Sequence, residues 1–306
     1  MKPTGPVAPL LAAAIIVSLA GCAAAPPPGP RIDPALAGLI PQDTVIMAGL
    51  RLEALKRAPV YQKFLTHRSV PQIDAFGKRT GIDAQKDLWE LLYVSNGKSG
   101  ALLGHGMFSD EGEPKLQRRG DNRFGYKGFN LVGNEEQAIL LINQTVLAIG
   151  DTNELRAMVD AHEKSAGPPA AMAALLARMP AAVQVWAAYD GGGMRLPLDA
   201  GGNLGNVNKI ASLIQTGTLY LDFSTGLEGV AEGTSANEHD AEQLESGLKA
   251  LIQFGQLSAS AKQPQLVSAL SGLRPLREKL EVKLQISEPE ESVDSLLDLL
   301  LGKAAK

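Results

Sequence analysis

The sequence predicts an α+β protein built from two similar halves, each an antiparallel sheet with covering helices. Three observations support this class. Short apolar runs, several of them alternating with polar residues, come in pairs separated by turn residues, as in β-hairpins. Segments with apolar residues at helical spacing stand between the pairs. In both parts of the chain the order is a strand entered after a proline, a helix, hairpin strands and a closing helix.

The composition is that of a globular protein. The 306 residues are 45% hydrophobic and 20% charged, and the net charge is −4. Charges of both signs are interspersed, which argues against a nucleic-acid partner, because such a protein needs a clustered basic face. The one dense cationic run, Lys115 to Arg119 with Arg123 and Lys127 nearby, is predicted to be a solvated hairpin tip. A site for anionic lipid or polymer is the alternative for this run.

Residues 1–21 have the three parts of a secretory signal peptide. Lys2 supplies a positive start, Pro9 to Ala20 is an apolar run, and small residues precede a cleavage site. The apolar run is too short to span a bilayer comfortably, since a spanning helix needs about 20 apolar residues. A retained transmembrane anchor is the alternative, but prolines interrupt the run and follow it directly.

The signal peptide ends in Leu19-Ala20-Gly21-Cys22. This sequence resembles the lipobox of bacterial lipoproteins. The resemblance implies diacylglycerol on the Cys22 sulfur, cleavage before Cys22 and usually acylation, as with palmitate, of the new α-amino group. Two or three acyl chains hold a protein on a membrane durably, whereas one chain does so only marginally. The membrane is therefore an expected partner, through the lipid on Cys22.

The residues around Cys22 also indicate a compartment. Ala23 follows it, whereas in lipoproteins of double-membraned bacteria aspartate at this place tends to mark retention at the inner membrane. The resemblance therefore implies the periplasmic face of the outer membrane. Cys22 is the only cysteine, so the domain has no intramolecular disulfide.

Three segments follow the signal peptide. Residues 22–40 are predicted to be a Pro/Ala-rich tether, extended at least over Ala23 to Pro34 because proline fixes φ and removes hydrogen-bond donors. Residues 41–165 form the first α+β half and residues 166–306 the second. The boundary is placed at the sequence Glu163 to Pro169, which breaks the apolar pattern.

The first half is predicted to start with a strand over Thr44–Leu52, followed by helical spacing up to Leu65. Asn96-Gly97 between two apolar runs indicates a hairpin. The capping-box sequence Asp151 to Glu154 indicates the start of a helix. The other predicted elements are a helix over 71–78, strands over 88–95, 100–109, 124–132, 138–142 and 145–149, and a loop over 110–121.

The second half is predicted to repeat this plan. Leu280 to Ile286 alternates strictly between apolar and polar residues, which is typical of an antiparallel strand with one wet face. The last helix is predicted from the apolar stripe of Val293, Leu296 and Leu300. The other predicted elements are helices over 170–179, 207–214, 237–254 and 266–273, strands over 183–189, 218–223 and 227–234, and a glycine-rich loop over 191–205.

A repeated sequence feature suggests a diverged duplication. Leu39-Ile40-Pro41 precedes the first strand as Arg178-Met179-Pro180 precedes the first strand of the second half. This layout resembles uncharacterised bacterial lipoproteins with duplicated α+β halves. That resemblance implies no activity.

No motif for catalysis, cofactor binding or a structural metal is found. The four histidines, His67, His105, His162 and His239, are scattered and lack metal-ligand spacing. Trp89 and Trp186 lie among apolar strand residues and are predicted to be core. Asp190 and the glycine-rich loop after it, with Asp199, Asn203 and Asn206, could offer oxygen ligands to calcium, but an exposed connector is the preferred interpretation.

The sequence therefore predicts a non-enzymatic binding or scaffold module of the cell envelope. Its expected partner is an envelope protein or a small apolar ligand. The alternative is an envelope hydrolase whose site is assembled from distant acids such as Asp190 and Asp222. A cleft with close, buried carboxylates would favour the hydrolase. A flat polar sheet face, or an apolar groove without titratable groups, would favour binding.

Overall fold

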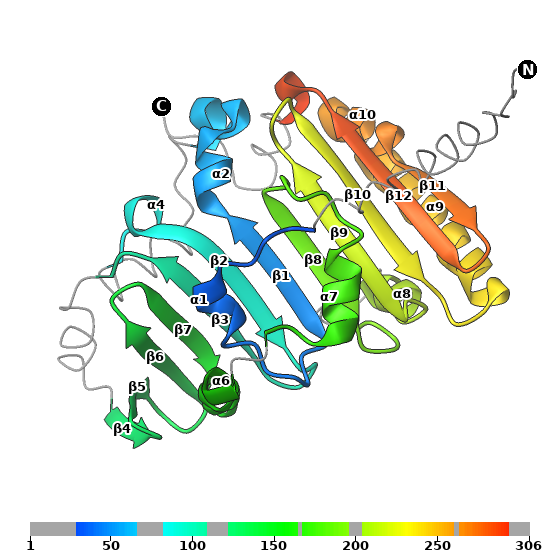
Figure 1. Ribbon diagram of the computed structural model, residues 1–306. Helices are drawn as coiled ribbons and strands as arrows, with labels where there is room; N and C mark the ends of the chain where they lie inside the picture. The colour runs from blue at the N-terminus through cyan, green and yellow to red at the C-terminus, as the bar shows by residue number, and fades with distance from the viewer. Residues whose placement is uncertain are drawn as a thin grey trace, which may run out of the picture.

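The computed structural model describes residues 29–65, 82–108, 122–164, 167–195, 204–259 and 263–293. In these parts of the chain, all twelve strands belong to one sheet, and every neighbouring pair is antiparallel. The predicted α+β class with antiparallel sheets is confirmed (Figure 1). None of the helices in the described ranges is long and apolar enough to cross a membrane.

The two halves each contribute one side of the sheet. The first half supplies β1 (Ile46–Arg51), β2 (Leu88–Ser95), β3 (Gly100–Gly106), β4 (Asn122–Tyr126), β5 (Phe129–Gly133), β6 (Gln137–Asn143) and β7 (Val146–Asp151). The second half supplies β8 (Val185–Asp190), β9 (Thr216–Asp222), β10 (Leu227–Thr234), β11 (Arg274–Glu278) and β12 (Glu281–Glu288). β1 pairs with β8, so the two sheets expected from the sequence are continuous through their first strands.

Helices cover both faces of the sheet. On the face toward the viewer in Figure 1 lie α1 (Pro34–Ala37), α6 (Thr152–Lys164) and α7 (Ala170–Leu176). Behind the second half lie α8 (Leu204–Ala211) and α9 (Glu238–Ala259). The remaining helices are α2 (Leu52–Arg57), the π-helix η2 (Tyr61–Leu65), α4 (Ala84–Asp87) and α10 (Pro264–Gly272).

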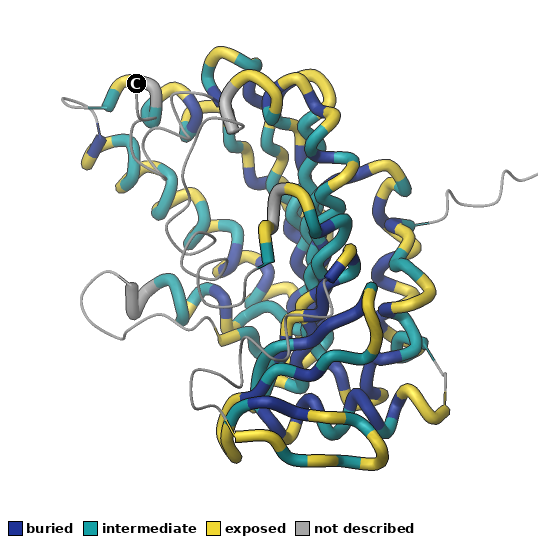
Figure 2. Tube along the Cα trace, turned by 90° about the vertical axis from the view of Figure 1, so that its left-hand side faces the viewer, coloured by how far each residue is buried: buried dark blue, intermediate teal, exposed yellow. Residues whose placement is uncertain are grey.

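The main core lies between the front face of the sheet and α1, α6 and α7. It includes Met47, Leu92, Leu103 and Trp186 from four strands, all fully buried. Full burial of such a side chain contributes about 1.5–3 kcal/mol each. A smaller core of Ala241, Leu244 and Val282 packs α9 against the second half. Figure 2 shows the buried residues along the interior of the trace and the exposed ones on outer turns.

The end of the predicted tether belongs to the fold. Residues 34–37 form α1, and Leu36, Leu39 and Ile40 are fully buried in the main core. The prediction that the tether covers residues 22–40 is therefore wrong for residues 34–40, which belong to the folded domain. The proline-rich composition suggested an extended chain, but Pro34 is the first residue of a short helix, a position where proline is well tolerated.

The two halves share one strand order. Outward from the middle of the sheet, the first half runs β1, β2, β3, β7, β6, and the second runs β8, β9, β10, β12, β11. The first half then continues with the hairpin β5–β4, whereas α9 and α10 occupy the corresponding stretch of chain in the second half. An approximate two-fold axis through the β1–β8 pair relates the halves.

Backbone hydrogen bonds fix which residues correspond across this axis. The amide of Arg51 donates to the carbonyl of Gln184 (2.8 Å), and the amide of Asp190 donates to the carbonyl of Val45 (2.9 Å). The two bonds become equivalent when Val45 is matched with Gln184 and Arg51 with Asp190, which is the same shift in residue number for both pairs. That shift also matches the proline at position 41 with the proline at position 180. The sequence similarity around the two prolines therefore follows the same alignment as the hydrogen bonds of the β1–β8 pair. We call this alignment of the two halves the two-fold correspondence.

Two predictions about strands are wrong. Residues 124–132 were expected to be one strand, but β4 and β5 form a hairpin that turns at Lys127 (φ 45°) and Gly128 (φ 85°). Lysine rarely takes positive φ, so the turn gave little signal. β11 was not predicted, because Pro275 lies within it; it is an edge strand, where proline is tolerated. The predicted helix over 71–78 and loop over 110–121 lie outside the described residues, as does the closing helix after Val293.

Candidate functional site

The acids singled out from the sequence are not brought together. Asp190 pairs with Thr216 at one end of the β8–β9 ladder, whereas Asp222 lies just beyond the pair Leu221–Val185 at the other end. The strand between Val185 and Asp190 spans about 17 Å. The two carboxylates therefore cannot act on one bond. The prediction that Asp190 and Asp222 form one hydrolase site is therefore wrong.

The surroundings of Asp222 explain its charge structurally. Its carboxylate accepts hydrogen bonds from the Ser224 amide (2.8 Å), the Ser224 hydroxyl (2.6 Å) and Gln184 Nε2 (3.2 Å). Burial acts to raise the pKa of Asp222, but these hydrogen bonds outweigh it and hold the pKa below its ordinary value. Cys22, Asp199 and Asn203 lie outside the described residues. Within the described ranges, no three His, Cys, Asp or Glu side chains group as a metal site.

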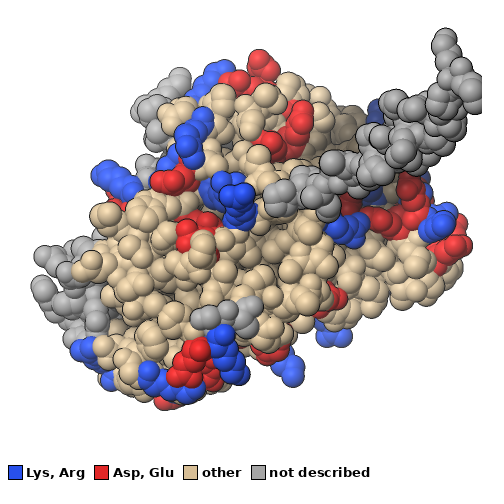
Figure 3. Space-filling model, viewed as in Figure 1, with Lys and Arg blue, Asp and Glu red and all other residues tan. Residues whose placement is uncertain are grey.

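A polar pocket lies at one end of the front face of the sheet, beside α1 and α2. Its volume is about 150 Å³. Figure 3 shows acidic and basic side chains next to one another in the region between α1 and α2. The lining residues come from the start of α1, the end of β1, α2, β2 and β3: Asp33, Arg51, Glu53, Ala54, Arg57, Trp89, Glu90 and His105.

The sheet register creates the floor of this pocket. Arg51, Glu90 and His105 pair side by side across β1, β2 and β3. Alternation places them on the same face as Met47, Leu92 and Leu103, the core residues of these strands. Polar side chains thus continue the core face where the buried apolar residues end.

A bulge positions the aromatic wall. The pairing of β2 with β3 shifts between Leu88 and Glu90, so Trp89 has no partner in this ladder. Such bulges change the direction in which a side chain points. The Trp89 ring lies 4.9 Å from the His105 ring, nearly perpendicular to it (85°). The prediction that Trp89 belongs to the core is wrong, whereas Trp186 is fully buried as predicted.

Asp33 ties the polar groups to α1. Its Oδ1 accepts from the Ala35 amide (2.8 Å) as the N-cap of α1, and its Oδ2 lies 3.1 Å from His105 Nδ1. The amide of Asp33 donates to Glu90 Oε1 (3.3 Å). The segment leading from the tether therefore forms one wall of the pocket.

The Glu90 carboxyl is the most perturbed group in the pocket. Burial raises its pKa to about 7, and the negative charge of Asp33 acts in the same direction. The hydrogen bond from the Asp33 amide and the charge of Arg51 oppose this rise. Near neutral pH the Glu90 carboxyl is therefore present in both its neutral and its ionised form, so a small change in pH changes its charge.

A second buried carboxylate, Glu154, lies at the start of α6. Its carboxylate accepts from the Ser99 hydroxyl (2.7 Å), and its other oxygen has no partner among the described residues. Burial raises its pKa. Asp151 accepts from the Gly100 amide (2.8 Å), so both acids of the predicted capping box hold the β2–β3 hairpin.

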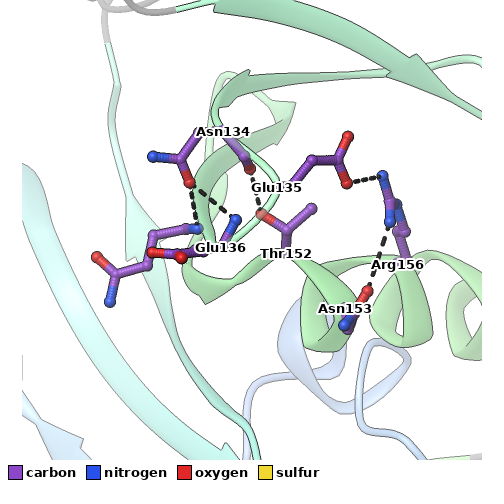
Figure 4. Close-up of polar contacts among 7 residues, drawn as sticks. Asn134, Glu135, Glu136, Thr152, Asn153 and Arg156 are labelled. Atoms are coloured by element: carbon purple, nitrogen blue, oxygen red, sulfur yellow. Dashed lines mark hydrogen bonds and ion pairs between the residues drawn. The ribbon is translucent and has the colours of Figure 1, made fainter.

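The same helix start is also fastened to the β5–β6 turn (Figure 4). The Thr152 hydroxyl donates to the Asn134 carbonyl (2.7 Å), and Arg156 pairs with Glu135 (3.2 Å). Asn134 Oδ1 in turn accepts from the amides of Glu136 and Gln137. These contacts join the start of α6 to the β5–β6 turn, and we assign them a structural role.

Comparison with known proteins identifies the fold alone. No family model and no curated protein matches the sequence. The structure resembles that of TP0453 in several crystal forms. Form III has a TM-score of 0.51 at 10% identity and covers 88% of this chain and 99% of that one. Form I has a TM-score of 0.45 at 11% identity, and the match covers 88% of this chain and 98% of that one.

Proposed function

We propose that this protein is a lipid-anchored component of the bacterial cell envelope that acts as a non-enzymatic binding module. The lipobox ending in Cys22 supports the anchor, and Ala23 supports the periplasmic face of the outer membrane. The pocket beside Asp33 supports binding close to the point where the tether enters the domain. Its charged lining favours a polar partner over the small apolar ligand expected from the sequence.

The composition of the pocket lining carries the preference for binding over hydrolysis. None of the eight lining residues is a serine, threonine, cysteine, lysine or tyrosine, so carboxyl groups and one imidazole are the only side chains of the pocket that covalent catalysis could use. Both carboxylate oxygens of Asp33 are already engaged, one by Ala35 and one by His105. What remains available is a set of fixed charges and one titrating carboxyl, which suits recognition.

An envelope hydrolase is the second candidate, and one observation favours it. Glu90, whose pKa is raised to about 7, lies beside the Asp33–His105 pair. A carboxyl or imidazole of this kind could activate a water molecule as a general base. Assays of the protein on ester, peptide, glycan and phosphoester substrates, with and without divalent metal, separate the two functions. We expect no turnover; turnover abolished by Glu90→Gln or His105→Gln would establish the hydrolase.

The anchor is tested at Cys22. Cys22→Ser removes the thiol that would carry diacylglycerol, so the variant should accumulate as an uncleaved precursor that takes up no labelled palmitate and leaves the detergent phase. An Ala24→Ser variant, altered close to the same site, serves as a control that should be processed normally. Normal maturation and detergent-phase partition of Cys22→Ser would refute the lipoprotein proposal.

A further inference from the structure

We propose that the pocket binds a small oxyanion, a carboxylate or phosphate group, through the guanidinium groups of Arg51 and Arg57. This proposal rests on the binding function above and specifies its ligand class. It follows from three observations: the equivalent position in the other half, the available donors in the pocket, and the balance of charges around it.

The approximate two-fold axis supplies an internal comparison. The row Arg51–Glu90–His105 across β1, β2 and β3 corresponds to the row Asp190–Thr216–Thr234 across β8, β9 and β10. The same shift in residue number, extended to Asp33 at the N-cap of α1, gives Met172, which is fully buried inside α7. The second half thus builds the same part of the fold with two threonines and a methionine. Because the fold does not require Glu90, His105 and Asp33 there, their presence in the first half calls for another reason.

The two arginines retain hydrogen-bond donors that the described residues leave available. Arg51 Nη1 donates to the Ala181 carbonyl (3.1 Å), and Arg57 Nε donates to the Glu53 carbonyl (3.1 Å). These bonds help to orient the two side chains, of which Arg51 is half-buried and Arg57 is exposed. Within the described residues neither guanidinium forms an ion pair, although three carboxyl groups line the same pocket. A guanidinium group matches the planar geometry of carboxylate and phosphate, so a pocket with two such groups is suited to an oxyanion.

The charges around the pocket make the binding depend on pH. Arg51 and Arg57 contribute +2, and Asp33 and Glu53 contribute −2, so the lining is neutral when Glu90 and His105 are neutral. Ionisation of Glu90 makes it −1, which opposes an anion, and a proton on His105 makes it more positive. Since the pKa of Glu90 is about 7, acidification from pH 8 to pH 6 removes the repulsive charge.

The proposal is tested by calorimetric titration of the full-length protein, purified in detergent, with inorganic phosphate and separately with succinate. The fluorescence of Trp89, which lies in the pocket wall, gives a second readout. We expect saturable binding of at least one anion, and the two arms show whether phosphate or carboxylate is preferred. For succinate, whose carboxylates are largely ionised at both values, binding should be about tenfold tighter at pH 6 than at pH 8, which is the ratio of protonated Glu90 at these two values.

Variants assign the effect to the named residues. Arg51→Met and Arg57→Met should each weaken binding about tenfold or more. Glu90→Gln should bind succinate at pH 8 about as tightly as the unaltered protein does at pH 6. His105→Gln measures how much the imidazole contributes to anion binding. Arg178→Met is the matched control, because Arg178 pairs with Glu232 and Glu281 away from the pocket. Circular dichroism confirms that each variant is folded.

The outcomes separate this proposal from the broader one. Absence of saturable binding of both anions, or unchanged binding in both arginine variants, would overturn the oxyanion site. If crosslinking in cells then still recovered an envelope partner through this pocket, the binding function would stand with a different ligand. If oxyanions bind as expected but turnover is found, the site stands and the non-enzymatic function fails.

Discussion

Gly49 and Trp186 face each other across the β1–β8 pair, and so do Met47 and Ala188. In the two-fold correspondence, Gly49 is matched with Ala188 and Met47 with Trp186. In each of the two cross-strand pairs a large side chain therefore lies next to a small one: Met47 next to Ala188, and Trp186 next to Gly49. A Cβ atom built on Gly49 would overlap the indole ring of Trp186.

Gly49→Ala should therefore destabilise the domain. Because the ring is fully buried and cannot move aside freely, we expect a loss of about 1–3 kcal/mol in the free energy of unfolding. Chemical denaturation measures it. In a Trp186→Met background, which reproduces the Met47–Ala188 pair, the same change should cost at least about 1 kcal/mol less. Gly38→Ala is the control, since no atom lies within 4 Å of its added Cβ and its φ is −67°. Equal losses in both backgrounds would contradict this.

The raised pKa of Glu90 predicts how stability changes with pH. In the unfolded chain this carboxyl loses its proton near the ordinary value of 4.5, whereas the folded domain keeps it up to about pH 7. The folded state therefore binds more protons between these values, and stability falls as pH rises from 4.5 to 7. With a discount for partial solvent exposure, the contribution is about 1–2 kcal/mol.

Urea denaturation at pH 5, 6, 7 and 8 tests this contribution. Other groups titrate as well, so the difference between the unaltered protein and Glu90→Gln is the relevant quantity. Glu90→Gln should gain stability relative to the unaltered protein as pH rises to 7, and the difference should then level off. A difference that does not change with pH would show that Glu90 titrates normally.

At the scale of elements, α6 is held to the β2–β3 hairpin through one buried carboxylate. The Ser99 hydroxyl donates to Glu154, and the second oxygen of Glu154 has no partner within the described residues. Ser99→Ala removes this hydrogen bond and leaves a buried carboxylate without any of its described partners. We expect a loss of about 1–3 kcal/mol in unfolding free energy, measured by denaturation.

A double variant tests the cause. In the presence of Glu154→Ala, the additional effect of Ser99→Ala should be small, because no buried carboxylate remains. Ser292→Ala, which changes a serine of the second half far along the chain from this contact, provides a baseline. Additive losses in the double variant would mean that Ser99 acts through another contact.

Elements with a strong local pattern could be predicted from the sequence. The alternation in β12 and the apolar stripe of α9 gave their type, since only one face of each is buried. The β4–β5 turn and β11 were missed because Lys127 and Pro275 are uncommon residues for those places. Local propensity says little where the tertiary structure imposes an unusual residue.

The candidate pocket could not be predicted, for a different reason. Asp33, Glu90 and His105 lie far apart in the chain, and only the pairing of β2 with β3 and the position of α1 bring them together. Asp33 lay in a segment interpreted as a tether, and the bulge that leaves Trp89 unpaired had no signature in the sequence. Spacing along the chain cannot reveal a site that depends on register.

At the scale of the whole molecule, the two-fold relation predicts how the first half behaves alone. Residues 29–165 would expose the edge of β1 that β8 normally covers. Because β1 and β8 correspond to each other at the symmetry axis, a second copy of β1 can take the place of β8. We expect this fragment to form a dimer, measured by light scattering during size-exclusion chromatography.

A proline in the exposed strand distinguishes this pairing from general association. Gly49→Pro removes an amide donor of β1 that faces β8 and should shift the fragment to a monomer. Gly125→Ala, in the distant strand β4, where an added Cβ has room, tests for unspecific effects. A fragment that is monomeric at all concentrations would show that the β1 edge does not pair with itself.

The β1–β8 pair also sets the order of events while the chain is made. Ile46 and Tyr189 are neighbours in the sheet although nearly all of the first half and the start of the second lie between them in the chain. At about 5–20 residues per second, synthesis of that stretch takes roughly 7–30 seconds. During this interval the β1 edge emerges without its partner, as an open template for other chains. Closure of the middle of the sheet must then wait for the second half, and we expect that the β1 edge needs protection from other chains until β8 has been made.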